Sequence, residues 1–307
     1  MLPIRLRDFI EDPDGWLYAI SAYDNEEKIG CVLRYVPDEN GERVGPDGRR
    51  YRKYDFEDAY AKIAQEKPAY AGLVQRVPPG DIHRVLKPDE EIGRIAAAHP
   101  NVRKLLDIFS LPPGTVGCTG SLLCGLANES SDIDMVVYGK HWFAAQALVK
   151  KGIESGVIEG MSPELWRKVY TKRKPEIPYD VFVLHEQRKW NRGQINQTYF
   201  DILYTRSYDN LAGAPSGKGT VLGKKTIEAT VTDASLAFDN PAVYLVEHDE
   251  ITKVLSFTHT YSGQALTGET IEACGVVEQH GDERWLIVGT TREARGEYII
   301  SKTLLEQ

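Results

Sequence analysis

This sequence of 307 residues has few cysteines, no long apolar run and no excess of positive charge. The four cysteines have no CxxC spacing, which argues against a zinc site and favours free thiols in a reducing cytoplasm; they are Cys31, Cys118, Cys124 and Cys274. No stretch approaches the ~18 consecutive apolar residues of a membrane span, and the N-terminus lacks the apolar core of a signal peptide. We therefore expect a cytoplasmic protein that does not enter a membrane.

The balance of residue types bounds the function further. With 42% hydrophobic and 27% charged residues, the chain has the composition of a globular protein, and its length suits two or three domains. The formal net charge of −8 argues against a surface coated in positive charge for indiscriminate nucleic-acid binding. It is compatible with a local basic strip.

Two carboxylates lead into a short apolar run that predicts a strand. Asp132 and Asp134 are separated by one residue and precede the run from Met135 to Tyr138. Because side chains alternate along a strand, the two carboxylates point to the same face, while Ile133 points into a core. Like charges so close repel each other unless a cation lies between them, and Mg²⁺ prefers oxygen ligands. The pair therefore predicts a magnesium site.

A Gly-Ser pair lies upstream of these carboxylates. Gly120 and Ser121 follow a short apolar segment, residues 115–118, and precede a predicted short helix. Such a turn offers backbone N–H groups and a hydroxyl to phosphate oxygens. A phosphate-binding turn and a metal-binding carboxylate pair, one short helix apart, indicate a protein that handles a nucleoside triphosphate.

The spacing of these residues resembles the signature of the DNA polymerase beta-like nucleotidyltransferase superfamily. The matching positions are Gly120, Ser121, Gly125, Ser131, Asp132 and Asp134. The resemblance covers roughly residues 90–205 and implies a mixed sheet with helices on one side. It also implies a third carboxylate on a later strand of the same sheet. Asp180 is the candidate, because it opens the apolar run of residues 178–184, which we expect to be a strand.

Roles for the site residues follow from this resemblance. Two Mg²⁺ ions, for which Mn²⁺ can substitute, would bridge Asp132 and Asp134, and one would also bind Asp180. Asp180 could in addition accept the proton of the acceptor hydroxyl, directly or through water. The NTP substrate would be held at six positions: Gly120, Ser121, Gly125, Ser131, Lys189 and Arg192. Many minimal members carry an Arg soon after the Ser, whereas this chain has Leu122, Leu123 and Cys124 there.

The chain divides into three parts by pattern. We expect an N-terminal α+β module over residues 1–87, the catalytic domain over 88–206 and a small β-barrel over 223–307. The barrel is predicted to be OB-like, although an SH3-like barrel has a similar pattern. A basic run at residues 49–53 fits a solvated hairpin strand better than a phosphate contact. The layout resembles that of uncharacterised archaeal predicted nucleotidyltransferases.

Three functions are compatible with the sequence. The first is Mg-dependent transfer of a nucleoside monophosphate to a nucleic-acid 3′ end, with RNA or another single strand as partner, which the barrel and the basic groups favour. The second is the same transfer to a protein or small molecule. The third is nucleic-acid binding by a protein whose transferase domain is inactive, which the missing Arg after Ser121 keeps open.

Overall fold

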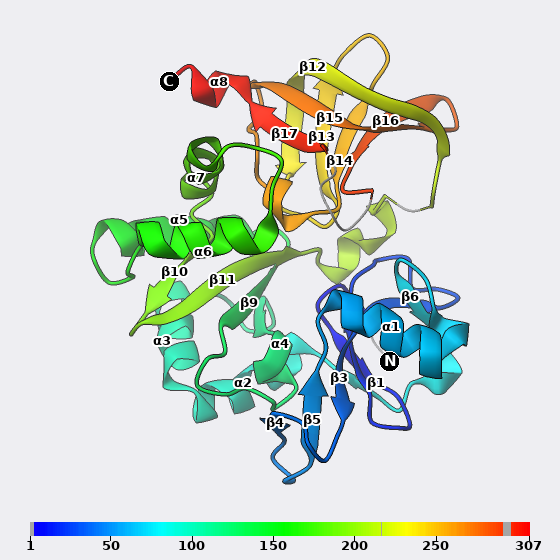
Figure 1. The fold of residues 1–307 in the computed structure, drawn as a ribbon. Helices are drawn as coiled ribbons and strands as arrows, with labels where there is room; N and C mark the ends of the chain where they lie inside the picture. The colour runs from blue at the N-terminus through cyan, green and yellow to red at the C-terminus, as the bar shows by residue number, and fades with distance from the viewer. Residues whose placement is uncertain (1–2, 216, 291–295) are drawn as a thin grey trace. The chain divides into compact units, whose positions relative to one another are not determined.

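The computed structural model describes residues 3–215, 217–290 and 296–307, and its architecture is mixed α+β (Figure 1). The chain forms two compact units, one of Met1–Glu159 with Asn191–Ala214 and one of Gly160–Trp190 with Pro215–Gln307. This division differs from the expected one, because the N-terminal module and the catalytic sheet share a unit and residues 160–190 lie outside it. No helix in the described ranges is long and apolar enough to cross a bilayer.

An antiparallel sheet of seven strands opens the first unit. Its order is β4-β5-β3-β2-β1-β7, with β6 paired to β3. The strands are β1 (Phe9–Glu11), β2 (Leu17–Ile20), β3 (Ile29–Pro37), β4 (Arg43–Val44), β5 (Arg50–Lys53), β6 (Gln75–Val77) and β7 (Arg84–Leu86). Helix α1 (Phe56–Glu66) is capped by Asp55 and buries Ala59 and Ile63 in the same core as Tyr18 and Leu33. The short helices η1 (Pro68–Tyr70) and η2 (Pro79–Asp81) follow.

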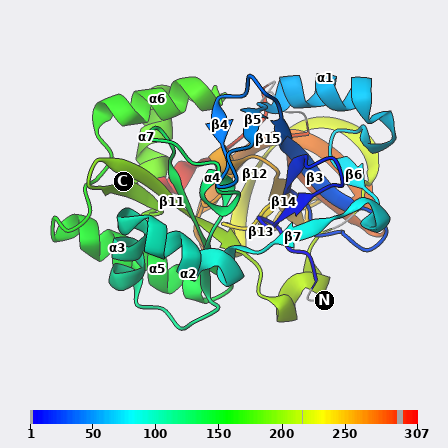
Figure 2. The same ribbon diagram turned by 90° about the horizontal axis from the view of Figure 1, so that it is seen from below.

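The second sheet of this unit carries the Asp-x-Asp motif. Its order is β10-β11-β9-β8, from β8 (Val116–Cys118), β9 (Ile133–Tyr138), β10 (Arg192–Ile195) and β11 (Thr198–Thr205). Strands β9 and β11 are parallel, and the other neighbours are antiparallel. Helices α2 (Pro88–Ala98), α3 (Pro100–Phe109) and α5 (His141–Glu154) lie side by side against it (Figure 2). The short α4 (Gly120–Leu123) joins β8 to β9, and η3 (Tyr208–Gly213) ends the unit.

The second unit combines two helices with a six-stranded sheet. The strands are β12 (Thr220–Leu236), β13 (Ala242–Glu247), β14 (Lys253–Ser256), β15 (Thr270–His280), β16 (Glu283–Val288) and β17 (Tyr298–Ser301). The order is β12-β13-β14-β16-β15-β17, and β12 also pairs with β15. Helices α6 (Pro163–Arg173) and α7 (Tyr179–Gln187) place Trp166 and Phe182 in one core with Tyr244 of the sheet. The short η4 (His259–Tyr261) and α8 (Lys302–Leu305) complete it.

The expected strand at residues 178–184 is wrong, because this segment forms helix α7. The run of Val and Phe residues indicated a strand, but Phe182, His185 and Glu186 are buried at helical spacing. Pro178 precedes the first turn, where proline is well tolerated, and Asp180 lies in that turn, where a negative charge is favourable. Packing against the neighbouring sheet therefore outweighs the strand propensity of these residues.

Candidate active site

Two carboxylates lie side by side on the parallel strands β9 and β11. The register pairs Asp134 with Asp201, so both side chains point to the same face of the sheet. Asp132 precedes β9 by one residue and is exposed, whereas Asp134 is half-buried and the Asp201 side chain is 15% exposed. The face that carries these carboxylates is opposite to the face that Ile133 buries.

The neighbouring carboxylates raise the pKa of Asp134. The pKa of Asp134 is raised to about 6, first by burial and then by the negative charges of Asp201 and Asp132. Two cations from the N-terminal part of the unit, Arg7 and Lys53, act in the opposite direction. The site is therefore a cluster of neighbouring carboxylates, which a bound cation would stabilise.

Asp201 is held by its own hairpin. The Tyr199 hydroxyl donates to Asp201 Oδ2 at 2.8 Å, and Arg192 Nε lies 3.4 Å from Oδ1. The Oδ1 atom is buried and accepts no hydrogen bond from any residue that the structure describes. A buried carboxylate oxygen without a hydrogen-bond donor is costly, and the positive charge of the nearby Arg192 offsets part of that cost.

Gly120 brings the phosphate-binding turn against Asp134. Its φ is +68°, and a Cβ atom there would lie 2.7 Å from Asp134 Oδ2. The preceding Thr119 donates its N–H to the Asp134 carbonyl at 2.9 Å. Position 120 therefore requires glycine for two reasons, the positive φ and the close approach of the Asp134 carboxylate. Ser121 follows it as the second residue of α4.

A hydrogen-bonded loop leads from this turn to Asp132. Gly125 has φ +69°, and a Cβ there would lie 3.1 Å from Pro46 Cγ. The Ser131 hydroxyl accepts hydrogen bonds from Arg43 Nη1 at 3.0 Å and from the Asn128 N–H at 2.9 Å. The Ser131 side chain thus holds the loop that precedes Asp132.

Comparisons with known proteins identify the family of this chain. A family model described as nucleotidyltransferase domain matches residues 102–191. The uncharacterized protein MJ1086 of Methanocaldococcus jannaschii is 36% identical over 339 aligned positions, which cover 97% of this chain and 99% of that protein. The chain belongs to the family of that archaeal protein and carries a polymerase beta-like nucleotidyltransferase domain. No solved structure matches it significantly.

The donor set of this nucleotidyltransferase domain suits Mg²⁺. Among the described residues, no three His, Cys, Asp or Glu side chains converge closely enough to hold a metal ion by themselves. Mg²⁺ usually binds through one or two carboxylates together with water and substrate phosphates. The adjacent carboxylates of Asp134 and Asp201 fit that mode.

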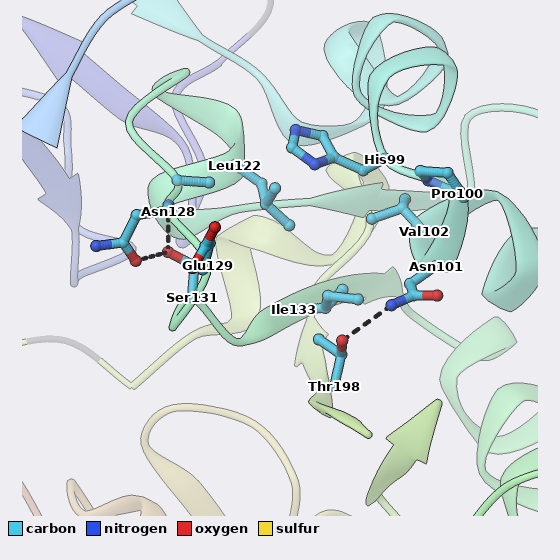
Figure 3. Close-up of a pocket in the computed structure, with 11 residues that line it drawn as sticks. His99, Pro100, Asn101, Val102, Leu122, Asn128, Glu129, Ser131, Ile133 and Thr198 are labelled. Carbon is cyan, nitrogen blue, oxygen red and sulfur yellow. Dashed lines mark hydrogen bonds between the residues drawn. The ribbon is translucent and has the colours of Figure 1, made fainter. Parts of the chain in front are cut away.

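A cavity of about 410 Å³ adjoins the motif loop of the nucleotidyltransferase sheet (Figure 3). Figure 3 shows Asn101, at the start of α3, directed at Thr198, to whose Oγ1 atom it donates at 2.9 Å. Ile133 lines the cavity, whereas the carboxylates do not. Strand alternation therefore places this cavity on the face of β9 opposite to Asp134.

Two of the residues that the sequence placed in the site belong to the second unit. Asp180 is exposed in the first turn of α7, in the second unit, and does not belong to a strand of the nucleotidyltransferase sheet. Lys189 is also in the second unit, where it is buried, pairs with Glu186 and donates to the Thr260 carbonyl at 2.9 Å. Arg192, in contrast, lies beside Asp201.

Asp201 is the residue that sequence reasoning missed. A signal for it exists, because Asp201 is the acidic residue at a less buried position of an alternating strand, between the buried Phe200 and Ile202. The residue is adjacent to Asp134 only through the pairing of β11 with β9. The matched family region ends at residue 191 and so does not reach it.

Proposed function

We propose that this protein transfers a nucleoside monophosphate from an NTP to a hydroxyl acceptor in a metal-dependent reaction, with a nucleic-acid 3′ end as acceptor. The observation that carries the proposal is the parallel register of β9 and β11, which sets Asp201 beside Asp134. Asp201 takes the role of third carboxylate that the sequence had suggested for Asp180. The nucleotidyltransferase domain supports the reaction class.

In this reaction the acceptor oxygen attacks the α-phosphorus of the NTP. A bond forms between that oxygen and the α-phosphorus, the bond from the α-phosphorus to the bridging oxygen breaks, and pyrophosphate leaves. Asp134 and Asp201, with Asp132 near them, would hold Mg²⁺ together with water and the substrate phosphates. The bound ion would neutralise phosphate charge and lower the pKa of the acceptor hydroxyl. Asp201, oriented by the hydrogen bond from Tyr199, would accept the hydroxyl proton, directly or through water. Ser121 and the amides near Gly120 would bind the β- and γ-phosphates.

The second unit supports a single-stranded nucleic acid as acceptor. Its pairings run β12-β13-β14-β16-β15 and return to β12, and β14 is parallel to β16. This connectivity supports an OB-like barrel, a fold that binds oligonucleotides. His280 and Trp285 stack at 3.8 Å, and Lys253 Nζ lies 4.7 Å from the Trp285 ring. A partly exposed aromatic pair with a cation is the kind of platform on which bases stack.

A labelling experiment with two matched variants tests the reaction. The protein is incubated with each α-labelled NTP, Mg²⁺ or Mn²⁺, and single-stranded RNA, single-stranded DNA or a protein lysate. We expect label in nucleic acid, and a loss of about 100-fold or more in Asp201→Asn, because removal of one charge-stabilising group typically costs that much. The control Asp180→Asn should keep wild-type activity.

Each other outcome has a defined meaning. Label in protein alone would replace the nucleic-acid acceptor with a protein one. An Asp180→Asn variant that is inactive beside an active Asp201→Asn variant would reverse the assignment of the third carboxylate. Absence of label with all four NTPs and every acceptor would contradict nucleotidyl transfer.

A further inference from the structure

The motif turn lacks a positive charge at the position where minimal nucleotidyltransferases carry one. Leu122 and Leu123 follow Ser121, and both are buried. A triphosphate carries several negative charges, and charged hydrogen-bond donors bind phosphate oxygens most strongly. Cations for this role therefore have to come from another segment of the unit.

One face of the β4–β5 hairpin is directed at the motif loop. The register pairs Arg43 with Tyr51, and Tyr35 of β3 with Lys53, so these four side chains share a face of the N-terminal sheet. From this face Arg43 Nη1 donates to the Leu126 carbonyl at 3.3 Å as well as to Ser131. Lys53 therefore extends on the side of the hairpin that faces the motif.

The other cations of the basic run are engaged elsewhere. Arg52, whose side chain points to the opposite face, pairs with Asp38 at 2.7 Å. Arg50 donates to the Gly41 carbonyl at 2.9 Å, and Arg49 to the Asp14 carbonyl at 3.3 Å. Lys53 differs from these three because it shares the face of the hairpin from which Arg43 contacts the motif loop.

Arg7 approaches the motif turn from a second direction. Its carbonyl accepts a hydrogen bond from Thr119 Oγ1 at 2.6 Å, and Thr119 is the residue before Gly120. The Arg7 N–H donates to the Ile20 carbonyl at 3.2 Å, and the φ of Arg7 is +75°. A non-glycine residue adopts this conformation at a cost, and such residues concentrate at functional sites. The fold thus fixes the Arg7 backbone against the turn that carries Gly120.

We propose that Lys53 and Arg7 bind the β- and γ-phosphates of the NTP and so replace the Arg that is absent after Ser121. This assignment rests on the proposed function, because it concerns the substrate of the same site. It makes the N-terminal module a part of the active site and explains why the module shares a compact unit with the catalytic sheet.

Binding measurements test the roles of Lys53 and Arg7 without relying on catalytic turnover. Calorimetry with Mn²⁺ and each of inorganic tripolyphosphate, the four NTPs and the four NMPs compares Lys53→Met with the control Arg52→Met. We expect Lys53→Met to weaken tripolyphosphate and NTP binding about tenfold, which is typical for one charged hydrogen bond, and to leave NMP binding unchanged. Arg52→Met should bind all three ligand classes as the wild type does. Arg7→Asn removes the second cation while it keeps a residue that tolerates positive φ, and melting temperatures verify that each variant is folded.

The results can overturn the phosphate assignment and the proposed function independently of each other. If the wild type transfers nucleotides but Lys53→Met and Arg7→Asn bind triphosphate as the wild type does, the phosphate assignment is overturned and the proposed function stands. If the wild type binds tripolyphosphate through Lys53 but never transfers label, the phosphate site stands and the proposed function fails. A wild type that does not bind tripolyphosphate would also overturn the assignment.

Discussion

At the scale of single residues, Gly120 is constrained by both its backbone and its neighbour. Gly114 shares the positive φ, +76° against +68°, but a Cβ on Gly114 would meet nothing within 4 Å. A comparison of Gly120→Ala with Gly114→Ala therefore separates backbone strain from the contact with Asp134 Oδ2. Both variants should lose about 1 kcal/mol of stability, because alanine disfavours this φ.

Gly120→Ala should in addition lose Mn²⁺ binding, because its Cβ displaces the Asp134 carboxylate, whereas Gly114→Ala should bind Mn²⁺ as the wild type does. Urea unfolding gives the stability, and calorimetry with Mn²⁺ gives the binding. Equal Mn²⁺ affinity in the two alanine variants would show that the contact between Gly120 and Asp134 does not shape the metal site.

The residues of the motif loop could be placed from the sequence because their geometry is local. Gly120 and Asp134 lie within one short segment that holds α4, a loop and the start of β9, and their spacing in the motif implies proximity. Asp201 could not be placed in this way. Its position depends on the pairing of two strands that are separated by three helices and another strand. No local pattern specifies such a pairing.

At the scale of elements, a buried histidine joins α7 to β17. His185 Nδ1 donates to the Val181 carbonyl at 2.8 Å, and the Ser301 N–H donates to Nε2 at 2.9 Å. The ring is therefore neutral, with its proton on Nδ1. Burial lowers the pKa of His185 to about 4, below the ordinary value near 6.5. Protonation would break the contact with Ser301 and leave a buried charge.

This shift predicts a pH dependence of stability. Because the folded pKa is below the unfolded one, the unfolded chain binds the extra proton between about pH 6.5 and pH 4. The stabilisation is complete above pH 6.5 and is lost as the pH falls through 4, with a total of about 3 kcal/mol. Urea unfolding of the wild type and of His185→Gln at pH 7.5 and 5 measures it.

His185→Gln should be less sensitive to this pH change than the wild type, because glutamine keeps a donor and an acceptor but does not titrate. Other groups titrate in both proteins and cancel in the comparison. Equal losses of stability in both proteins would contradict the role of His185.

Elements were predictable where the pattern was decisive. Apolar residues recur at helical spacing from Phe56 to Ile63, which predicts a helix over residues 56–65. Helix α1 matches this prediction within one residue, and Asp55 caps it. Residues 178–184 were not predictable, because their Val and Phe residues suit a strand and a buried helix equally. Contacts of Phe182 and His185 with the neighbouring sheet settle the choice, and those contacts involve residues far along the chain.

At the scale of the whole molecule, residues 160–190 interrupt the first unit. An isolated bridge joins the two flanks of this segment, in which the Glu159 N–H donates to the Gln194 carbonyl at 3.0 Å and the Gln194 N–H donates to the Glu159 carbonyl at 2.8 Å. The segment itself places Trp166, Ile177 and Phe182 in the core of the second unit. Sequence order therefore does not give the division into compact units.

This arrangement predicts different behaviour for two truncated proteins. Residues 1–214 would carry Trp166, Ile177 and Phe182 without the sheet that buries them, and each such side chain is worth about 1.5–3 kcal/mol of burial. A second protein, in which a short Gly-Ser linker replaces residues 160–190, removes these side chains. Because the bridge holds the two flanks together, a short linker can close the gap.

We expect the linker protein to be monomeric and cooperatively folded, and the uninterrupted 1–214 protein to bind the dye ANS and to aggregate. Size-exclusion chromatography and ANS fluorescence distinguish the two proteins. If the uninterrupted 1–214 protein stays monomeric and does not bind ANS, residues 160–190 bury their apolar side chains without the sheet of the second unit.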